Sequence, residues 1–287
     1  MCWIKCGRGY LRFHRQPLRL PGSCNAALIA PGPQPLLLLV RFTEREILSR
    51  FAGSAFGLVW ALVNPLLLLG IYAFVFGQLF KTRMGDLSTD SYVAFLAIGL
   101  WPWMMFADGV MRALQSVQAN APLIKKVAFP HLLLVLAAVN SVFLVHLAGY
   151  AAVLVLLAAT GSTIHLVGIP SLLLAIATLY LLAVGVGAFF AALQPLLRDV
   201  EQVVAPGLMM LQFLTPVLYP VSVIPEAYRH WFALSPLTGV MQHLREGLLQ
   251  GSLPQSGDLM MLFVGAIVAA IGLGFFVRLS PYFEDFL

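Results

Sequence analysis

Few charged or polar residues stand where they could do chemistry, because most of them lie at the borders of long apolar segments. Asp108 and Arg112 are four residues apart inside one apolar segment, and this spacing lets two side chains pair along one face of a helix. The pair is either structural or part of a proton relay, since a charge inside a bilayer is costly unless it is paired or serves a pathway. His146 shares another apolar segment with Asn140 and is either a hydrogen-bond partner between helices or an ion-coupling residue. We favour the structural interpretation of both sites.

Motifs of hydrolytic enzymes are absent from the whole sequence. No Gly-Lys dipeptide occurs, so there is no GxxxxGKS/T phosphate-binding loop, and neither HExxH nor GxSxG is found. Cys2, Cys6 and Cys24 lack the partner residues and the spacing of a zinc site. We therefore expect no enzyme activity, no metal and no cofactor in this chain, and any energy for its work must come from a partner protein or an ion gradient.

Composition indicates that lipid surrounds most of the chain. Hydrophobic residues make up 60% of the sequence and charged residues 10%, whereas about 25% of residues are charged in an ordinary soluble domain. The apolar residues form blocks that are longer than the buried strands of a soluble protein. The predicted fold class is all-α integral membrane, with six transmembrane helices over residues 57–80, 92–114, 132–160, 168–193, 203–219 and 259–277.

Three other segments complete the predicted organisation. Residues 1–35 mix basic residues with prolines and are expected to be a disordered or non-native extension of the membrane domain, residues 36–287. Residues 38–56 place apolar and charged side chains on opposite helix faces, which predicts either an interfacial helix or a cytoplasmic extension of the first span. Residues 221–256 are too polar to cross the membrane and too apolar for a free loop. We expect two short helices there that re-enter the outer leaflet, or else a surface loop over the helix ends.

The distribution of basic residues predicts the orientation in the membrane. An even number of spans places both termini on one side, and that side holds thirteen lysines and arginines. The other side holds four, which are Lys81, Arg83, Arg229 and Arg245. Because cytoplasmic loops carry the excess of positive charge, both termini are predicted to be cytoplasmic.

Aromatic side chains recur on two of the predicted spans. Tyr72, Phe76 and Phe80 are spaced at four-residue intervals on the first span, and Trp101 and Trp103 lie on the second. Such faces can stack against sugar rings, but the same pattern is typical of helix packing and of interfacial aromatic belts. Both interpretations stay open on the residues alone.

Several ordered blocks after Val40 are similar to those of one family of membrane proteins. The blocks are RFTEREILSRFAGSAFGLVWALVNPLLLLGIYAFVFGQLF, GLWPWMMFADGV, NAPLIKKVAFP and VIPEAYRHWFALSPLTGVMQHLREGLLQG. Through them the chain resembles the ABC-2 type permeases of polysaccharide export. The block SPLT departs from the more usual Asn-Pro-Leu-Thr, although Ser235 can still cap the following helix.

The resemblance implies a function, partners and site residues. It implies a homodimeric permease in the bacterial inner membrane that moves a lipid-linked glycan such as an O antigen. The implied permease is paired with two copies of a separate ATPase, which binds ATP and Mg²⁺. The implied ATPase-docking residues are Arg45, Glu46, Arg50, Asn120, Lys125, Lys126, Phe129 and Pro130. The implied translocation path contains Trp60, Tyr72, Phe76, Phe80, Trp101 and Trp103. The implied periplasmic gate contains Ile224, Pro225, Trp231, Pro236 and Leu237.

Two other functions remain as alternatives. One is an ABC-2 efflux permease for small hydrophobic compounds, and the other is a secondary carrier that works alone on an ion gradient. The few candidate charges inside the predicted spans argue against the carrier.

Overall fold

A computed structural model describes residues 5–6, 9–10, 35–53, 56–57, 59–75, 89–127, 129–233 and 235–286. The chain divides into two compact units, Met1–Pro35 and Leu36–Leu287. In the first unit, strand β1 (Lys5–Cys6) pairs antiparallel with strand β2 (Gly9–Tyr10). Most of this unit lies outside the described residues, so its predicted disorder stays a prediction.

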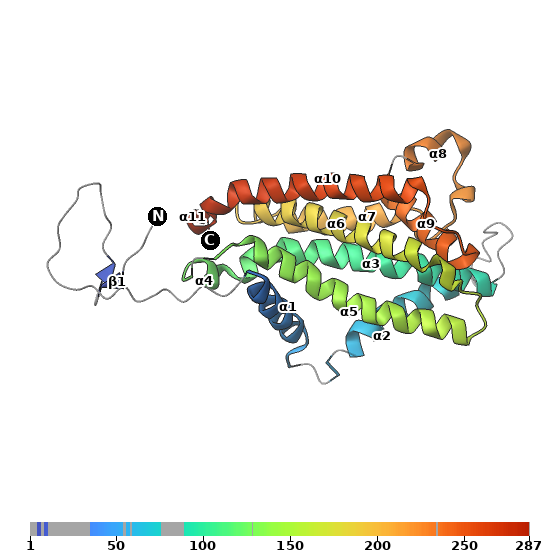
Figure 1. Ribbon diagram of the computed structural model, residues 1–287, viewed down its shortest axis with the longest axis horizontal. Coiled ribbons are helices and arrows are strands. Elements are labelled where there is room, and N and C mark those ends of the chain that lie inside the picture. Colours follow the sequence, from blue (N-terminus) through green and yellow to red (C-terminus); the bar gives the residue numbers. More distant parts are fainter. Residues whose placement is uncertain are drawn as a thin grey trace. The chain divides into compact units, whose positions relative to one another are not determined.

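The second unit is helical wherever it has regular structure in the described part of the chain. Its α-helices are α1 (Pro35–Phe51), α2 (Val59–Tyr72), α3 (Thr89–Ala119), α4 (Ala121–Ile124), α5 (Leu132–Ala159), α6 (Ile169–Leu193), α7 (Val200–Leu214), α8 (Glu226–Ala233), α9 (Pro236–Gln250), α10 (Ser256–Leu279) and α11 (Phe283–Phe286). Single 3₁₀ turns are η2 (Leu166–Gly168), η3 (Val221–Val223) and η4 (Ser280–Tyr282). Helices α3, α5, α6 and α10 run side by side (Figure 1).

Four helical segments are long and apolar enough to cross a membrane, and they coincide with four of the predicted spans. They are Tyr92–Ala119, Leu132–Ala159, Leu166–Leu193 and Ser256–Tyr282. This confirms an integral membrane protein whose membrane domain is helical in the described residues.

The other two predicted spans are represented by shorter apolar helices. The first is Val59–Val75, and the rest of its predicted span, residues 76–80, lies outside the described residues. The second is α7, whose 15 residues reach about 22 Å at ~1.5 Å per residue, against a ~30 Å hydrocarbon core. Helix α7 ends before Pro216 because a residue that precedes proline is pushed out of the helical region, and Thr215 is indeed extended, with φ −100° and ψ 138°.

Small residues allow close approach between α6, α9 and α10. A Cβ atom on Gly272 of α10 would collide with the backbone carbonyl of Gly185 on α6. A Cβ atom on Gly168 would likewise collide with the carbonyl of Gly247 on α9. Glycines at such crossings let helix backbones pack tightly, as is common between membrane helices.

Helix α1 corresponds to the predicted amphipathic helix, with different ends. It begins three residues earlier than predicted, at Pro35, and it ends at Phe51 instead of residue 56. Gly53 follows with φ +78°, a left-handed conformation that commonly ends helices. The side chain of Thr43 is buried, whereas Arg41 and Glu44 are exposed.

The segment predicted to hold two short helices contains α8 and α9, and these two have different environments. Helix α9 buries Leu237, Met241 and Leu244 against the bundle. Helix α8 is mostly exposed, and it contacts α9. The two predicted helices are therefore present, and α9 is an integral part of the core. Ser235 occupies the N-cap position of α9, but contrary to expectation its side chain makes no capping hydrogen bond.

Arg245 of α9 is a buried cation that is held by backbone carbonyl groups. Its guanidinium donates to the oxygens of Pro216 at 2.6 Å, Val217 at 2.5 Å and Phe95 at 3.2 Å. It also lies 3.6 Å from the centroid of the Phe95 ring, which is a cation–π geometry. A Cβ atom on Gly99 of α3 would collide with this guanidinium, so a larger residue there would displace the Arg245 side chain from its present position.

Burial of Arg245 lowers the pKa of its side chain. Desolvation lowers the pKa of its guanidinium to about 9, while the neighbouring Tyr150 and Tyr92 hydroxyls act in the opposite direction. Arg245 therefore remains charged at neutral pH. Within the described part of the chain, no carboxylate forms an ion pair with it.

Replacing Arg245 is predicted to weaken the fold. In Arg245→Met, the carbonyls of Pro216 and Val217 lose their donors inside the protein, and such a loss costs about 3 kcal/mol of unfolding free energy. In Arg245→Lys the charge is kept but the planar fork is lost, so we expect an intermediate effect. Unfolding in detergent micelles would measure both variants against Arg278→Met, which removes an exposed arginine from α10. Equal stability of Arg245→Met and Arg278→Met would contradict this role.

Candidate functional site

The charged face of α1 is joined to α3 by side-chain pairs. Arg112 Nε lies 2.8 Å from Glu46 Oε1, and the N–H is not aimed along a hydrogen bond, so the contact is a charge–charge pair. Arg45 Nη2 donates to Asn120 Oδ1 at 2.6 Å. Asn120 is buried, and its Nδ2 donates to the carbonyl of Ser116 at 2.8 Å, which fixes the orientation of the amide. Helix α1 is thus bound to the end of α3 that precedes α4.

A third pair extends this contact toward α5. Arg50 Nη2 lies 3.6 Å from Asp108 Oδ2, and the same carboxylate oxygen is 3.0 Å from His146 Nε2. His146 is 4% exposed, and its Nδ1 has no hydrogen-bond partner among the described residues. The indole N–H of Trp101 donates to the carbonyl of His146 at 3.0 Å. We refer to Arg45, Glu46, Arg50, Asp108, Arg112 and Asn120 as the α1–α3 cluster.

These contacts correct the predicted ion pair within the second span. Asp108 and Arg112 were expected to pair with each other along α3, but each pairs with a residue of α1. The physical reason is geometric. Glu46 and Arg50 are one helical turn apart on α1, as are Arg112 and Asp108 on α3, so both ion pairs can form at once between the two helices. The predicted interhelical role of His146 is confirmed, because it contacts Asp108 from α5.

The predicted ATPase-docking residues separate into two groups in the structure. Arg45, Glu46, Arg50 and Asn120 contact other residues of this chain through the α1–α3 cluster. The ring of Phe129 lies 5.5 Å from that of Phe42 on α1 and is half-buried. The exposed members are Lys125, Lys126 and Pro130, together with the neighbouring Val127. A partner protein therefore has direct access to the turn after α4.

The predicted translocation-path residues differ in their exposure. Trp101 and Trp103 are 1% and 2% exposed, so in this chain they pack between helices and do not line an open surface. A Cβ atom on Gly149 would collide with the Trp101 ring, which shows how closely α3 and α5 pack there. Trp60 is exposed and makes an edge contact with the Phe56 ring. Tyr72 is half-buried, and the remaining two positions, 76 and 80, lie outside the described residues.

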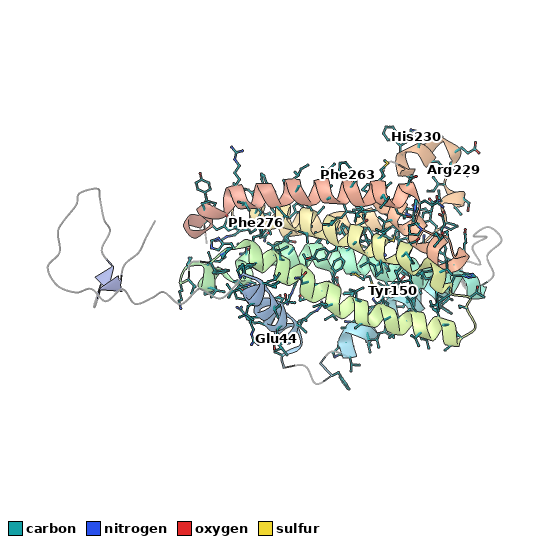
Figure 2. The ribbon with its side chains drawn as sticks, in the orientation of Figure 1. Glu44, Tyr150, Arg229, His230, Phe263 and Phe276 are labelled. Carbon is teal, nitrogen blue, oxygen red and sulfur yellow. The ribbon has the colours of Figure 1, made fainter. Side chains whose placement is uncertain are left out.

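The predicted gate residues lie around η3, α8 and the start of α9. Ile224 and Leu237 are buried, Pro236 is half-buried, and Pro225 and Trp231 are exposed. Figure 2 shows the neighbouring Arg229 and His230 of α8 at the surface. The gate assignment itself stays a prediction, because nothing in the structure tests an opening.

Sequence reasoning missed two polar contacts that join helices. Arg245 was counted as a basic residue of the outer loops, although it is buried by α3 and by the turn after α7. His243 Nδ1 of α9 lies 2.9 Å from the buried carboxylate of Asp258 on α10. The signal that could have found them is an ionisable residue inside an otherwise apolar helix face, which in a membrane protein predicts a specific partner.

The fold and the site together define a class: an integral membrane protein whose amphipathic first helix is bound by charge pairs to a bundle of apolar helices. The model of the ABC-2 type transporter family matches residues 38–249. The chain belongs to this family, which confirms the resemblance found in its sequence blocks.

Individual relatives extend the similarity over most of the chain. The O-antigen export system permease protein RfbA of Klebsiella pneumoniae is 32% identical over 253 residues, which cover 87% of this chain and 95% of the relative. RfbA of Myxococcus xanthus is 28% identical, covering 80% and 87% of the two chains. The polysialic acid transport protein KpsM of Escherichia coli is 26% identical, covering 81% and 89%.

A charge exchange would test the pairing of Glu46 with Arg112. Glu46→Arg and Arg112→Glu each place like charges together, whereas the double variant restores an opposite pair with reversed polarity. We expect each single variant to lose about 1 kcal/mol of unfolding free energy and the double variant to recover much of it. The measurement is a double-mutant cycle of unfolding in detergent. Strictly additive losses would show that the two side chains do not interact.

Proposed function

We propose that this chain is the permease subunit of an ATP-driven exporter that moves lipid-linked polysaccharide of the O-antigen type across the bacterial inner membrane. The observation that carries the proposal is near full-length similarity to relatives named for O-antigen export and polysialic acid transport, at 32% and 26% identity. The absence of a phosphate-binding loop from the sequence agrees with a subunit that leaves ATP hydrolysis to a partner.

The proposed complex contains two copies of this chain and two copies of a separate ATPase, which holds ATP and Mg²⁺. The apolar side chains Val203, Met209 and Phe213 of α7 are exposed in the single chain, and the second copy is proposed to cover them. Lys125 and Lys126 are exposed beside the α1–α3 cluster and are the proposed contact for the ATPase.

The proposed topology has six spans with both termini in the cytoplasm. In this topology α2 and α7 complete the set begun by the four long apolar helices. The count of lysines and arginines supports this topology. Arg245 is buried by protein, so three basic residues remain in the outer loops, against thirteen on the inner side.

The proposed mechanism uses α3 as the element that joins the two ends of the permease. At one end α3 is bound to α1 by Arg112 and Asn120, beside the proposed ATPase contact. At the other end it is bound to α9 through the carbonyl of Phe95 and to the turn after α7 by Tyr92 Oη, which donates to the Leu218 carbonyl at 3.1 Å. A movement of α1 that follows ATP binding would thus displace α7 and α9. Net transport further requires that the two states differ in affinity for the glycan.

Deletion of the gene tests the proposed cargo. We expect loss of surface polysaccharide together with accumulation of lipid-linked polymer on the cytoplasmic side, because synthesis continues while export is blocked. Both pools would be quantified separately in the deletion strain and in a strain complemented with the wild-type gene. Unchanged pools, with new sensitivity to small hydrophobic compounds, would instead support the efflux alternative.

Reversal of the exposed charges tests the docking surface. In Lys125→Glu/Lys126→Glu, two attractive charges become repulsive, so we expect at least about a tenfold loss of ATPase co-purification. The matched control is Arg229→Glu on α8, at the opposite end of the bundle (Figure 2). Undiminished recovery of the ATPase with the double variant would show that the turn after α4 is not the contact.

A further inference from the structure

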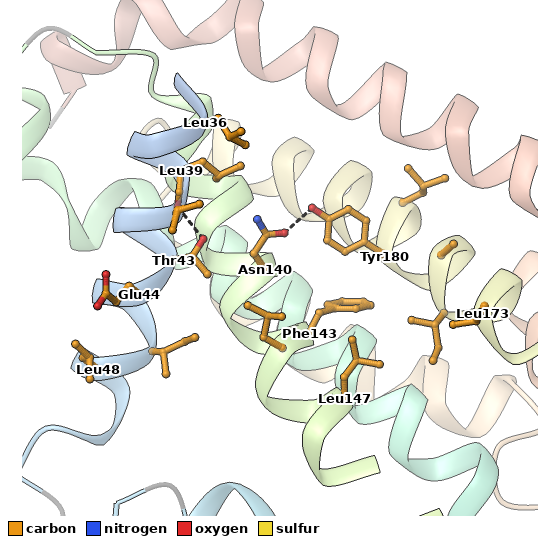
Figure 3. A pocket seen from close by; sticks show the side chains of 16 residues that line it. Leu36, Leu39, Thr43, Glu44, Leu48, Asn140, Phe143, Leu147, Leu173 and Tyr180 are labelled. Atoms are coloured by element: carbon orange, nitrogen blue, oxygen red, sulfur yellow. Dashed lines mark hydrogen bonds between the residues drawn. The ribbon is translucent and has the colours of Figure 1, made fainter. Parts of the chain in front are cut away.

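An apolar groove of about 920 Å³ lies between α1, α5 and α6. Figure 3 shows α1 on one side of it and the side chains of α5 and α6 on the other. Leu144 of α5 and Leu173 of α6 are 55% and 61% exposed there, so the groove opens sideways from the helix bundle. The aliphatic lining includes Leu39, Ile47, Leu147, Leu173, Ile176 and Leu181. In an integral membrane protein such a surface faces hydrocarbon chains.

One polar group inside this groove has an unused donor. Asn140 Oδ1 accepts a hydrogen bond from Tyr180 Oη at 2.6 Å, which fixes the amide in place. Asn140 Nδ2 donates to none of the described residues, and Figure 3 shows it directed toward α1. Asn140 is half-buried, and an amide donor that lines an apolar groove favours an acceptor supplied by a ligand. The ester carbonyl at the top of a lipid acyl chain is an acceptor of this kind.

The rim of the groove carries charges of both signs on α1. Arg41 Nη1 and Glu44 Oε2 are 3.1 Å apart, with side chains 69% and 55% exposed. A smaller hollow of about 360 Å³ lies beside the groove and is lined by Arg41, Glu44, Arg45 and Ser49. Glu44 and Leu48 line both cavities, so the polar hollow adjoins the apolar groove along α1.

We propose that this groove is a binding site for one phosphatidylethanolamine molecule of the surrounding bilayer. The acyl chains occupy the apolar groove, an ester carbonyl accepts from Asn140 Nδ2, the phosphate contacts Arg41 and the ammonium contacts Glu44. A zwitterionic headgroup matches the paired charges of the rim, whereas an anionic headgroup would meet the Glu44 carboxylate without an ammonium to neutralise it. The bound lipid would fill the space between α1 and the bundle, and so stabilise the position of α1.

Photolabelling tests the site in the full chain reconstituted into lipid nanodiscs. The probes are phosphatidylethanolamine, phosphatidylcholine and phosphatidylglycerol that carry the same diazirine acyl chain. Peptide mass spectrometry would quantify adducts on residues 140–147 of α5 and, for comparison, on the exposed face of α10. The phosphatidylcholine headgroup cannot donate to Glu44, so we expect about tenfold more α5 adduct with phosphatidylethanolamine, the effect of one charge-assisted hydrogen bond.

Two matched pairs of variants separate the groove from the headgroup site. Ala177→Trp fills the groove from an exposed position on α6, and we expect it to reduce α5 labelling several-fold, whereas Ala270→Trp on the exposed face of α10 should not. Glu44→Gln should abolish the preference for phosphatidylethanolamine, and Glu226→Gln on α8 should preserve it.

Three results would overturn the proposal. The first is equal α5 labelling by the three headgroups, or α5 labelling no stronger than that of α10, which would indicate ordinary boundary lipid. The second is efficient crosslinking between two copies of an Ala177→Cys variant, which would assign the groove to a second chain. The third is displacement of the probe by a polyprenyl phosphate at low concentration, which would assign it to the lipid part of a transported substrate. The first two results do not depend on the cargo, so the site and the proposed function can fail separately.

Discussion

The structure depends most on a buried guanidinium that, among the described residues, is held by backbone carbonyls and an aromatic ring instead of a carboxylate. Arg245 reaches the carbonyls of Pro216 and Val217 because α7 ends before Pro216 and leaves these groups without helical donors. It fits beside α3 because Gly99 has no side chain. Each group stabilises the other. Without Arg245, the carbonyl oxygens of the turn would be unpaired acceptors in an apolar interior, and without the carbonyls, the guanidinium would be a buried charge with no partner. This mutual dependence fixes where α9, α7 and α3 meet.

Helix α3 connects this anchor to the α1–α3 cluster at the other end of the bundle. It is a continuous helix of 31 residues, and its middle is packed against α5 and α6. Pro102 lies between the two attachments of α3. Coupling between distant sites can be carried by packed helices of this kind. The two attachments differ in character, because the ion pairs of the α1–α3 cluster are partly exposed, where salt can screen them, while the Arg245 contacts are buried. The end beside the proposed ATPase contact is thus the one that can be rearranged at lower cost.

The aromatic residues show why their spacing in the sequence does not define a translocation path. Trp101 and Trp103 have the side chains that would suit sugar stacking, yet both are buried by neighbouring helices of the same chain. Trp101 is held by its hydrogen bond to the His146 carbonyl and by contact with Gly149. Trp60, in contrast, is available at the surface. Helical spacing predicts which residues share a face but carries no information on which face meets another helix.

The sequence by itself determined the membrane class, the four long spans, the amphipathic first helix and the family, because these follow from hydropathy, helical periodicity and ordered local blocks. Only the tertiary structure decided which charges pair. Asp108 and Arg112 satisfy the spacing of a pair within one helix, but α1 brings Arg50 and Glu46 into reach, and a partner on a second helix also ties the two helices together. Arg245 is the clearest case: its apolar surroundings in the sequence indicate that it has a partner, but its partners are carbonyl groups, which every residue has, so the sequence does not indicate which ones.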